Sequence, residues 1–277
     1  MHSSFHRILS LATVLAFLAI WSWAALLIGN KVILPTVGDV AELLFHPNED
    51  LLSMGSLITN VVVSLFRVLI GYIVAVLVAI PLGIAMGYYV SVHTMFGDFL
   101  NLFRPIPPLA WVPLVMAWFG IASFADLFGV DRGLWFVYLN NFKYSMIFII
   151  FIGAFYPVLT SSIHGVRNVN RVFIDTARVL GAGEFDIFRK ILLPAALPSM
   201  VNGMRIGLGV AWMCLVSAEM LPGSISGVGY LITHAYTMAS TDIVVAGMFS
   251  IGLTGALMDW LFRRIERRCF SWQRLAR

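Results

Sequence analysis

The sequence predicts an all-α integral membrane protein with six transmembrane helices. Of its 277 residues, 60% are hydrophobic and 12% are charged, which is about half the charged share of a typical soluble domain. The mean hydropathy is +0.91. A helix needs roughly 20 apolar residues to cross a bilayer. Runs of that kind occur near 8–28, 59–88, 108–128, 142–164, 200–221 and 242–262.

The basic residues indicate that both termini lie in the cytoplasm. Lys and Arg are enriched at the cytoplasmic ends of spans, and with the N-terminus inside, 14 of the 18 basic residues fall in cytoplasmic segments. The outer loops hold Lys31, Arg132 and Lys143. We therefore expect a multi-pass protein of the cell (inner) membrane. Its net charge of +4 suits anchoring beside anionic lipid rather than nucleic-acid binding.

The first apolar run has an alternative interpretation as a cleaved signal peptide, because Arg7 precedes it. The run is longer than the usual core of about 7–15 residues, which favours a retained span. Segment 29–58 is polar and is expected outside the membrane, with a short helix around Val40 to Phe45.

The second span carries Pro81 near its predicted cytoplasmic end, and Gly83 and Gly87 stand four positions apart. Proline bends a helix, and glycines let another backbone approach closely. Ordinary membrane-helix packing explains these residues equally well.

The segment "RPIPPLAWVP", residues 104–113, has four prolines in ten positions. A regular helix does not continue through such a run, and non-helical backbone at membrane depth needs protein or a water-filled cavity around it. Arg104, Pro107, Pro108 and Trp111 are therefore candidates for a cytoplasmic gate or packing elbow. A plain turn remains the alternative.

The link between the fourth and fifth spans, about 165–199, is far longer than a helix-to-helix turn requires. Apolar residues recur at helical spacing on one face of its first part, and Gly181 is placed to end that helix. A second short helix follows and is expected to stop at Pro194. The apolar residues are Val169, Val172, Phe173 and Leu180 in the first helix and Phe185, Phe188 and Leu192 in the second.

Two short amphipathic helices joined at a glycine suit a groove in a partner protein. They suit equally a position on the lipid surface, where phenylalanine and basic residues are also favoured. The residues alone leave both interpretations open.

Two ionisable residues fall within or at the edge of spans, where charge is costly and often functional. Arg67 lies in the outer half of the second span, and Glu219 lies near the outer end of the fifth. If the two side chains meet, they would hold an outer gate; Arg67 would alternatively attract an anionic substrate. A structural ion pair, or snorkelling to the interface, is the plainer alternative.

The link also carries a family resemblance. "DTARVLGAGEFDIFRKILLP", Asp175 to Pro194, resembles the cytoplasmic loop of ABC-importer permeases, whose pattern is Glu-Ala-Ala, three residues, Gly, nine residues, then Ile-x-Leu-Pro. Asp175 replaces the usual Glu, and Thr176 replaces the first Ala. The segments "SLFRVLIGY", "IPLGIAMG", "RPIPPLAWVPL" and "GLGVAWMCLVSAEMLPGSISGVGYLI" are similar to the subgroup that imports nitrate, sulfonates, taurine or bicarbonate.

This resemblance implies a type I ABC-importer permease without an ATPase site of its own. It implies a homodimer of permeases, two ABC ATPase subunits that bind ATP and Mg²⁺, and an extracytoplasmic solute-binding protein that delivers a small anionic solute. The sequence contains no G-x-x-x-x-G-K-[ST] motif for phosphate. The residues expected to couple to the ATPase are Asp175, Ala177, Gly181, Ala182, Glu184, Phe185, Phe188, Arg189 and Pro194. Those expected to line the path or gate are Arg67, Pro107, Pro108, Trp111 and Glu219.

An ion-gradient-driven secondary transporter is the main alternative, since six spans with kinking prolines suit one as well. It would not need the helix pair of the link. An intramembrane enzyme is disfavoured, because the six histidines show no metal-site spacing and no evident nucleophile. We therefore expect no catalytic, cofactor or metal site on this chain, and a single domain over residues 1–277.

Overall fold

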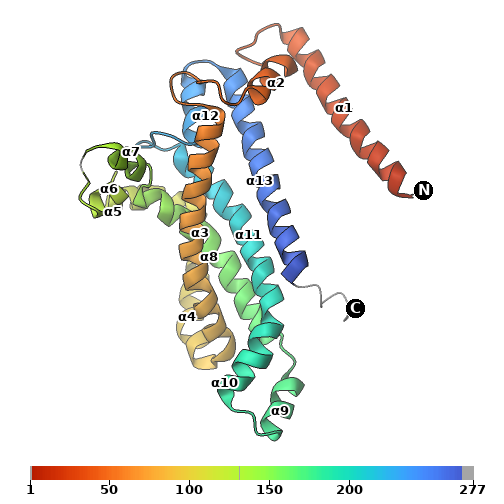
Figure 1. Ribbon diagram of the computed structural model, residues 1–277, viewed down its shortest axis with the longest axis vertical. Coiled ribbons are helices and arrows are strands. Elements are labelled where there is room, and N and C mark those ends of the chain that lie inside the picture. Colours follow the sequence, from red (N-terminus) through yellow and green to blue (C-terminus); the bar gives the residue numbers. More distant parts are fainter. Residues whose placement is uncertain (1, 131, 270–277) are drawn as a thin grey trace. The chain divides into compact units, whose positions relative to one another are not determined.

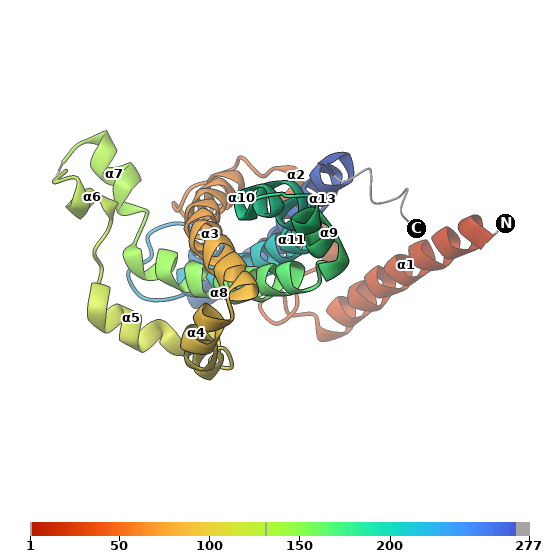
Figure 2. The same ribbon diagram turned by 90° about the horizontal axis from the view of Figure 1, so that it is seen from below.

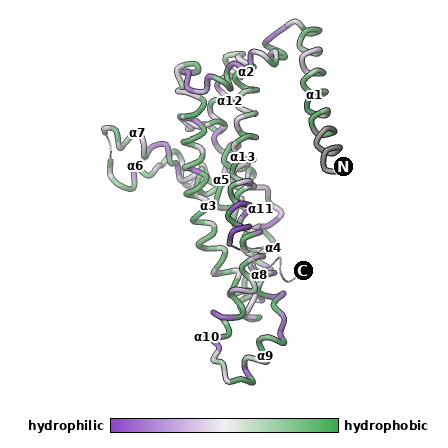
Figure 3. Tube along the Cα trace, turned by 45° about the vertical axis from the view of Figure 1, so that its right-hand side comes forward, coloured by the Kyte–Doolittle hydropathy of each residue, from purple (hydrophilic) through white to green (hydrophobic). Residues whose placement is uncertain are grey.

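The computed structural model of the protein describes residues 2–130 and 132–269, and every regular element in these ranges is a helix (Figure 1). In this part of the chain, five helices are long and apolar enough to cross a membrane. They are α1 (His2–Ile28), α3 (Leu57–Tyr88), α8 (Tyr144–Arg167), α11 (Leu193–Glu219) and α13 (Thr241–Cys269). Hydrophobic residues predominate along α1 and α3 (Figure 3). The all-α membrane prediction is confirmed.

The third predicted span, 108–128, is not one continuous helix. Helix α4 (Val90–Phe103) is followed by the 3₁₀ turn η1 (Pro108–Trp111) and α5 (Val112–Phe119), bent by 87° from α4. The prolines between them remove backbone donors and disfavour helical geometry before each ring. Counted as one broken span, this bent pair brings the number of candidate spans in the described residues to the six that were predicted.

Two short helices follow the broken span. The chain leaves α5 at Gly120, which has a φ of +54°, and then forms α6 (Phe124–Leu127) and α7 (Leu134–Asn140). The side chain of Asp126 caps α6 by accepting a hydrogen bond from the Ser123 N–H at 2.6 Å. This excursion explains why a single apolar helix over 108–128 was the wrong expectation.

The expected helix stop at Pro194 is also wrong. Helix α10 (Glu184–Ile187) runs through the π-helical turn η2 (Phe188–Leu192) directly into α11. The Leu193 N–H bonds the carbonyl of Phe188, five residues back. Pro194 then occupies the first turn of α11, where a missing N–H costs little. The wide turn therefore lets the helix continue into the proline.

The structure divides into two compact units, and the division falls within α3 and α13. The first contains residues up to 63 and 224–254. It includes the predicted outer helix, α2 (Val37–Phe45), and also α12 (Val228–Thr237). Its core joins Leu51, Leu57, Leu231, Ala235 and Ile243. The prediction of a single domain stays a prediction.

The second unit contains 64–223 and the part of α13 from 255 onward. Within it, α8 packs against both α3 and α11, and glycines form both contacts. A Cβ on Gly83 of α3 would lie 2.5 Å from the Cβ of Ser162, and one on Gly87 would lie 2.6 Å from the Cβ of Val166. On the other side, Gly203 of α11 faces Ser161 at similarly close range. The expected close approach at Gly83 and Gly87 is confirmed.

We predict that Gly203→Ala destabilises the protein, because its new methyl group would overlap Ser161. Overpacking of this kind costs about 1–3 kcal/mol. Gly209→Ala is the matched control on the same helix, since nothing lies within 4 Å of the Cβ position there. Thermal unfolding in detergent should show a lower Tm for Gly203→Ala and no loss for Gly209→Ala. Equal Tm values for the two variants would contradict the packing.

Candidate functional site

The predicted two-helix link forms a projection between α8 and α11. Helix α9 (Arg171–Val179) begins at Asn170, whose side chain accepts a hydrogen bond from the Val172 N–H at 3.0 Å. It ends at Gly181, whose φ of +82° favours glycine. The chain then turns into α10, and α9 and α10 lie side by side at one end of the second unit (Figures 1 and 2).

One face of this projection is apolar and open. The side chain of Phe185 is 72% exposed. We call the exposed apolar side chains of α9, α10 and their connection the apolar ridge; its members are Val172, Phe173, Val179, Leu180 and Phe185. Large apolar side chains gathered on a projecting element mark an interaction surface more often than isolated ones do.

The opposite face of the projection packs on the long helices. Ala177 and Ile187 are buried, and Phe188 packs with Ile174 against a core built around Leu192. The two phenylalanines expected to anchor a partner therefore differ: Phe185 is exposed, whereas Phe188 is half-buried against this core. Between them and the end of α3 lies a groove of about 730 Å³, whose lining includes Tyr88, Phe185 and Phe188.

Polar contacts fix α10 against both α9 and α3. Glu184 accepts a hydrogen bond from Arg178 Nε at 3.0 Å and one from the Tyr88 hydroxyl at 2.5 Å. Arg178 also lies 3.8 Å from the Asp175 carboxylate. The hydrogen bond to Glu184 raises the pKa of the Arg178 guanidinium above its ordinary value. Tyr88 was not expected here from sequence, since it is almost a hundred residues away from Glu184.

The remaining predicted coupling residues are placed as follows. The N–H of Ala182 donates to the carbonyl of Ala177 at 3.0 Å and so closes the turn after α9. Arg189 is exposed. Pro194 lies in the first turn of α11.

A buried ion pair lies toward the other end of α3 and α11. Arg67 Nη1 and Glu219 Oε1 are 2.6 Å apart, and the two side chains are 1% and 0% exposed. The hydroxyl of Ser64 lies 2.8 Å from both oxygens of Glu219. Arg67 Nε donates to the carbonyl of Asn141 at 2.7 Å. The hypothesis that Arg67 and Glu219 meet is therefore matched by the geometry, whereas Ser64 and Asn141 were missed.

One of these missed partners carried a sequence signal. Ser64 precedes Arg67 by three positions, so both lie on one face of α3. No sequence signal pointed to Asn141, because it contributes a backbone carbonyl from the connection before α8. Charges this deeply buried are stabilised only when their hydrogen-bonding groups are satisfied, and these partners provide that.

The proline elbow packs on α8 through an aromatic contact. The Trp111 ring lies 5.8 Å from Phe103 and 6.4 Å from Phe148 between centroids. Its buried indole N–H has no hydrogen-bond partner among the described residues. Pro107 precedes η1 and Pro108 begins it. The elbow is thus a packed turn, and its predicted part in a gate stays a prediction.

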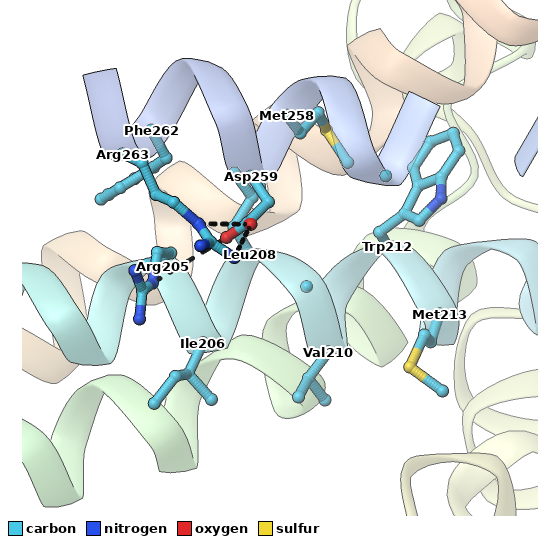
Figure 4. Close-up of a pocket in the computed structure, with 12 residues that line it drawn as sticks. Arg205, Ile206, Leu208, Val210, Trp212, Met213, Met258, Asp259, Phe262 and Arg263 are labelled. Carbon is cyan, nitrogen blue, oxygen red and sulfur yellow. Dashed lines mark hydrogen bonds and ion pairs between the residues drawn. The ribbon is translucent and has the colours of Figure 1, made fainter. Parts of the chain in front are cut away.

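A further charged cluster joins α11 to the end of α13. Asp259 lies 2.5 Å from Arg263 and 3.9 Å from Arg205. Figure 4 shows these three side chains beside one another. Arg205 also lies 3.6 Å from Glu266. Among the described residues, no three His, Cys, Asp or Glu side chains are grouped so that they could hold a metal ion.

Long apolar helices that carry a projecting helix pair define a multi-pass membrane protein with an exposed apolar ridge. Comparison with known proteins identifies the family within this class. The chain belongs to the family described as "Binding-protein-dependent transport system inner membrane component", whose model matches residues 79–271. Its members are permease subunits of ABC importers, and the resemblance of the link to this family is confirmed.

Named relatives match between 76% and 95% of the chain. A putative ABC transporter permease of Methanocaldococcus jannaschii is 46% identical over 92% of this chain and 88% of its own length. The taurine transport system permease of Escherichia coli is 33% identical, with 95% and 89% covered. Relatives named for nitrate (Leptolyngbya laminosa), aliphatic sulfonates (Bacillus subtilis) and bicarbonate (Synechococcus elongatus) are 31–33% identical. The predicted subgroup is confirmed.

A solved structure shares the fold. The inward-facing methionine ABC transporter MetNI contains a chain that superposes with a TM-score of 0.61 at 18% identity, covering 76% of this chain and 95% of that one. At this identity the match shows the fold alone, and it confirms the predicted type I permease architecture.

We predict that Arg67→Met or Glu219→Leu alone strongly destabilises the protein. Either change leaves one buried charge unpaired, which typically costs about 3–5 kcal/mol. The double variant removes both charges and should recover much of that loss. Unfolding in detergent measures the stability of the two single variants and of the double variant. If the double variant loses as much stability as the two single variants lose together, Arg67 and Glu219 do not form a direct pair.

Proposed function

We propose that this chain forms the translocation path for a small anionic solute in an ATP-driven importer. Two copies would surround the path, and a solute-binding protein would deliver the cargo on the outer side. The relatives named for taurine, nitrate, sulfonates and bicarbonate support this class of cargo. All of these solutes carry an anionic group of two or three oxygens.

The exposed apolar ridge carries the proposal. It projects from the link between α8 and α11, and its opposite face packs against α3, α8 and α11. An amphipathic helix that offers aromatic and aliphatic side chains suits a groove in a partner. In a family of ABC importer permeases, the partner is the ATPase subunit, which binds ATP and Mg²⁺. The ridge then lies on the cytoplasmic side, and both termini lie there too.

The projection is held firmly enough to transmit motion. Glu184 joins α10 to α9 through Arg178 and to α3 through Tyr88, and η2 continues α10 into α11 without a break. Movement of the ATPase would therefore displace the ends of α3 and α11 together. Shifts of packed helices of this kind exchange inward and outward access.

We predict that Phe185→Asp abolishes solute uptake and the copurification of ATPase subunits. The substitution places a charge in the centre of the apolar ridge, where docking would desolvate it. Phe45→Asp is the matched control, because Phe45 is 80% exposed on α2, outside the projection. Immunoblots of membranes should show equal amounts of both variants. Normal copurification by the Phe185→Asp protein would overturn the assignment of the ridge.

We predict that Gly181→Ala lowers uptake, whereas Gly183→Ala leaves it near the normal level. Nothing lies within 4 Å of either Cβ position, so the two differ in backbone conformation: φ is +82° at Gly181 and −71° at Gly183. A side chain in the left-handed region costs about 1–2 kcal/mol. Uptake and ATP hydrolysis by the assembled importer provide the measurement. Equal activity of the two variants would show that the turn does not set the docking geometry.

A further inference from the structure

A second groove, of about 380 Å³, lies between the proline elbow and the helices α8 and α11. The elbow contributes Arg104 and Pro108, one face of α8 contributes residues that include Ile152, Tyr156 and Ser161, and α11 contributes Ile206 and Val210. Pockets that bind small molecules in proteins have volumes of this order and combine apolar walls with a few polar groups. All lining residues belong to the second unit of the structure.

The polar side chains of this groove can donate hydrogen bonds, and three of them are free to donate to a ligand. Within the described part of the chain, the side chains of Arg104, Tyr156 and Ser161 make no hydrogen bond or ion pair to another residue. The hydroxyl of Thr160, by contrast, donates to the carbonyl of Tyr156 at 2.8 Å. No carboxylate lines the groove. The groove is therefore lined by one guanidinium and two hydroxyl groups, and no acidic residue of the lining neutralises the guanidinium.

Arg205 of α11, which lies outside this groove, differs from Arg104 because carboxylates neutralise its charge. Arg205 lies beside Asp259, as Figure 4 shows. Arg205 also lies 3.6 Å from Glu266, so two carboxylates balance its charge. Arg104 has no such neighbour among the residues that line its groove. Arg104 is exposed, so its guanidinium is open to an anion that enters the groove, and no fixed carboxylate of the lining competes for it.

We infer that this groove is a transient binding site for the oxyanion of the cargo, with Arg104 as its principal ligand. The inference rests on the proposed function and locates one step of it. A guanidinium offers a planar fork of donors that matches nitrate, bicarbonate or a sulfonate, and the hydroxyls of Tyr156 and Ser161 add two more donors. Ile152, Ile206 and Val210 make the remaining wall apolar, which strengthens the attraction. One unpaired charge binds an anion weakly enough for release, as conduction requires.

The test measures the sign of the local potential without any partner protein. In a Cys214→Ala and Cys269→Ala background, Ile152→Cys places a thiol in the groove. The purified permease in nanodiscs reacts with an anionic reagent, 2-sulfonatoethyl methanethiosulfonate, and with its cationic trimethylammonioethyl counterpart. We expect Arg104→Gln to lower the ratio of the anionic to the cationic rate by about fivefold or more, as loss of one unpaired charge predicts. Arg104→Lys, which keeps the charge, should retain most of the ratio.

Arg268→Gln is the matched control, since it removes one exposed positive charge outside the groove, and it should leave the ratio unchanged. Sodium nitrate, bicarbonate or taurine should slow the anionic reagent in the parent protein, and not in Arg104→Gln. An unchanged ratio in Arg104→Gln would overturn the inference. So would protection by phosphatidylglycerol in the nanodisc with none by the three solutes, because the groove would then hold a lipid phosphate.

These outcomes distinguish a failure of the proposed anion site from a failure of the proposed function. The reactivity ratio needs neither ATPase nor solute-binding protein, so it keeps its meaning if the chain fails to support ATP-driven uptake. In the complete importer, Arg104→Gln should also lower the rate of anion uptake several-fold, while ATPase copurification stays normal. Full uptake by Arg104→Gln would exclude the site even if the wild-type importer works as proposed.

Discussion

The close packing of α8 against α3 and α11 is the contact on which the rest of the second unit depends. Glycines at Gly83, Gly87 and Gly203 bring these backbones so near that a methyl group does not fit. Helices in a membrane gain little from hydrophobic association with one another and rely instead on such close contact. Interiors packed in this way are not continuously deformable. A displacement at one end of these helices is therefore expected to reach the other end.

The two ends carry different chemistry. One bears the projection, where Glu184 holds α10 to α9 and to Tyr88 at the end of α3. The other bears the buried pair of Arg67 and Glu219 with its partners Ser64 and Asn141. Helix α11 has 27 residues and so spans roughly 40 Å between them. An exposed docking surface and a buried electrostatic contact are thus joined by one set of tightly packed helices, which suits a permease that must exchange two states.

Much of this arrangement follows from the sequence, because its causes are local. Apolar length predicts the long helices, the conformational freedom of glycine predicts the turn at Gly181, and the cost of buried charge predicts that Arg67 and Glu219 find partners. The prolines of 104–113 predict the break before the third span, whereas its angle and the passage of the helix through Pro194 were not predictable in the same way. Each depends on backbone geometry, a bend of 87° and a π-helical turn, that hydropathy does not report. The contacts of Glu184 with Tyr88 and of Arg67 with Asn141 depend on tertiary packing alone.

The central claim is that the apolar ridge on α9 and α10 contacts the ATPase. A photoreactive benzoylphenylalanine at position 185, in membranes that contain the complete importer, tests it most directly, with position 45 as the comparison. The account predicts a crosslink to the ATPase subunit from position 185 and none from position 45. Crosslinks from position 185 to lipid alone, in membranes where the ATPase is present and active, would contradict it.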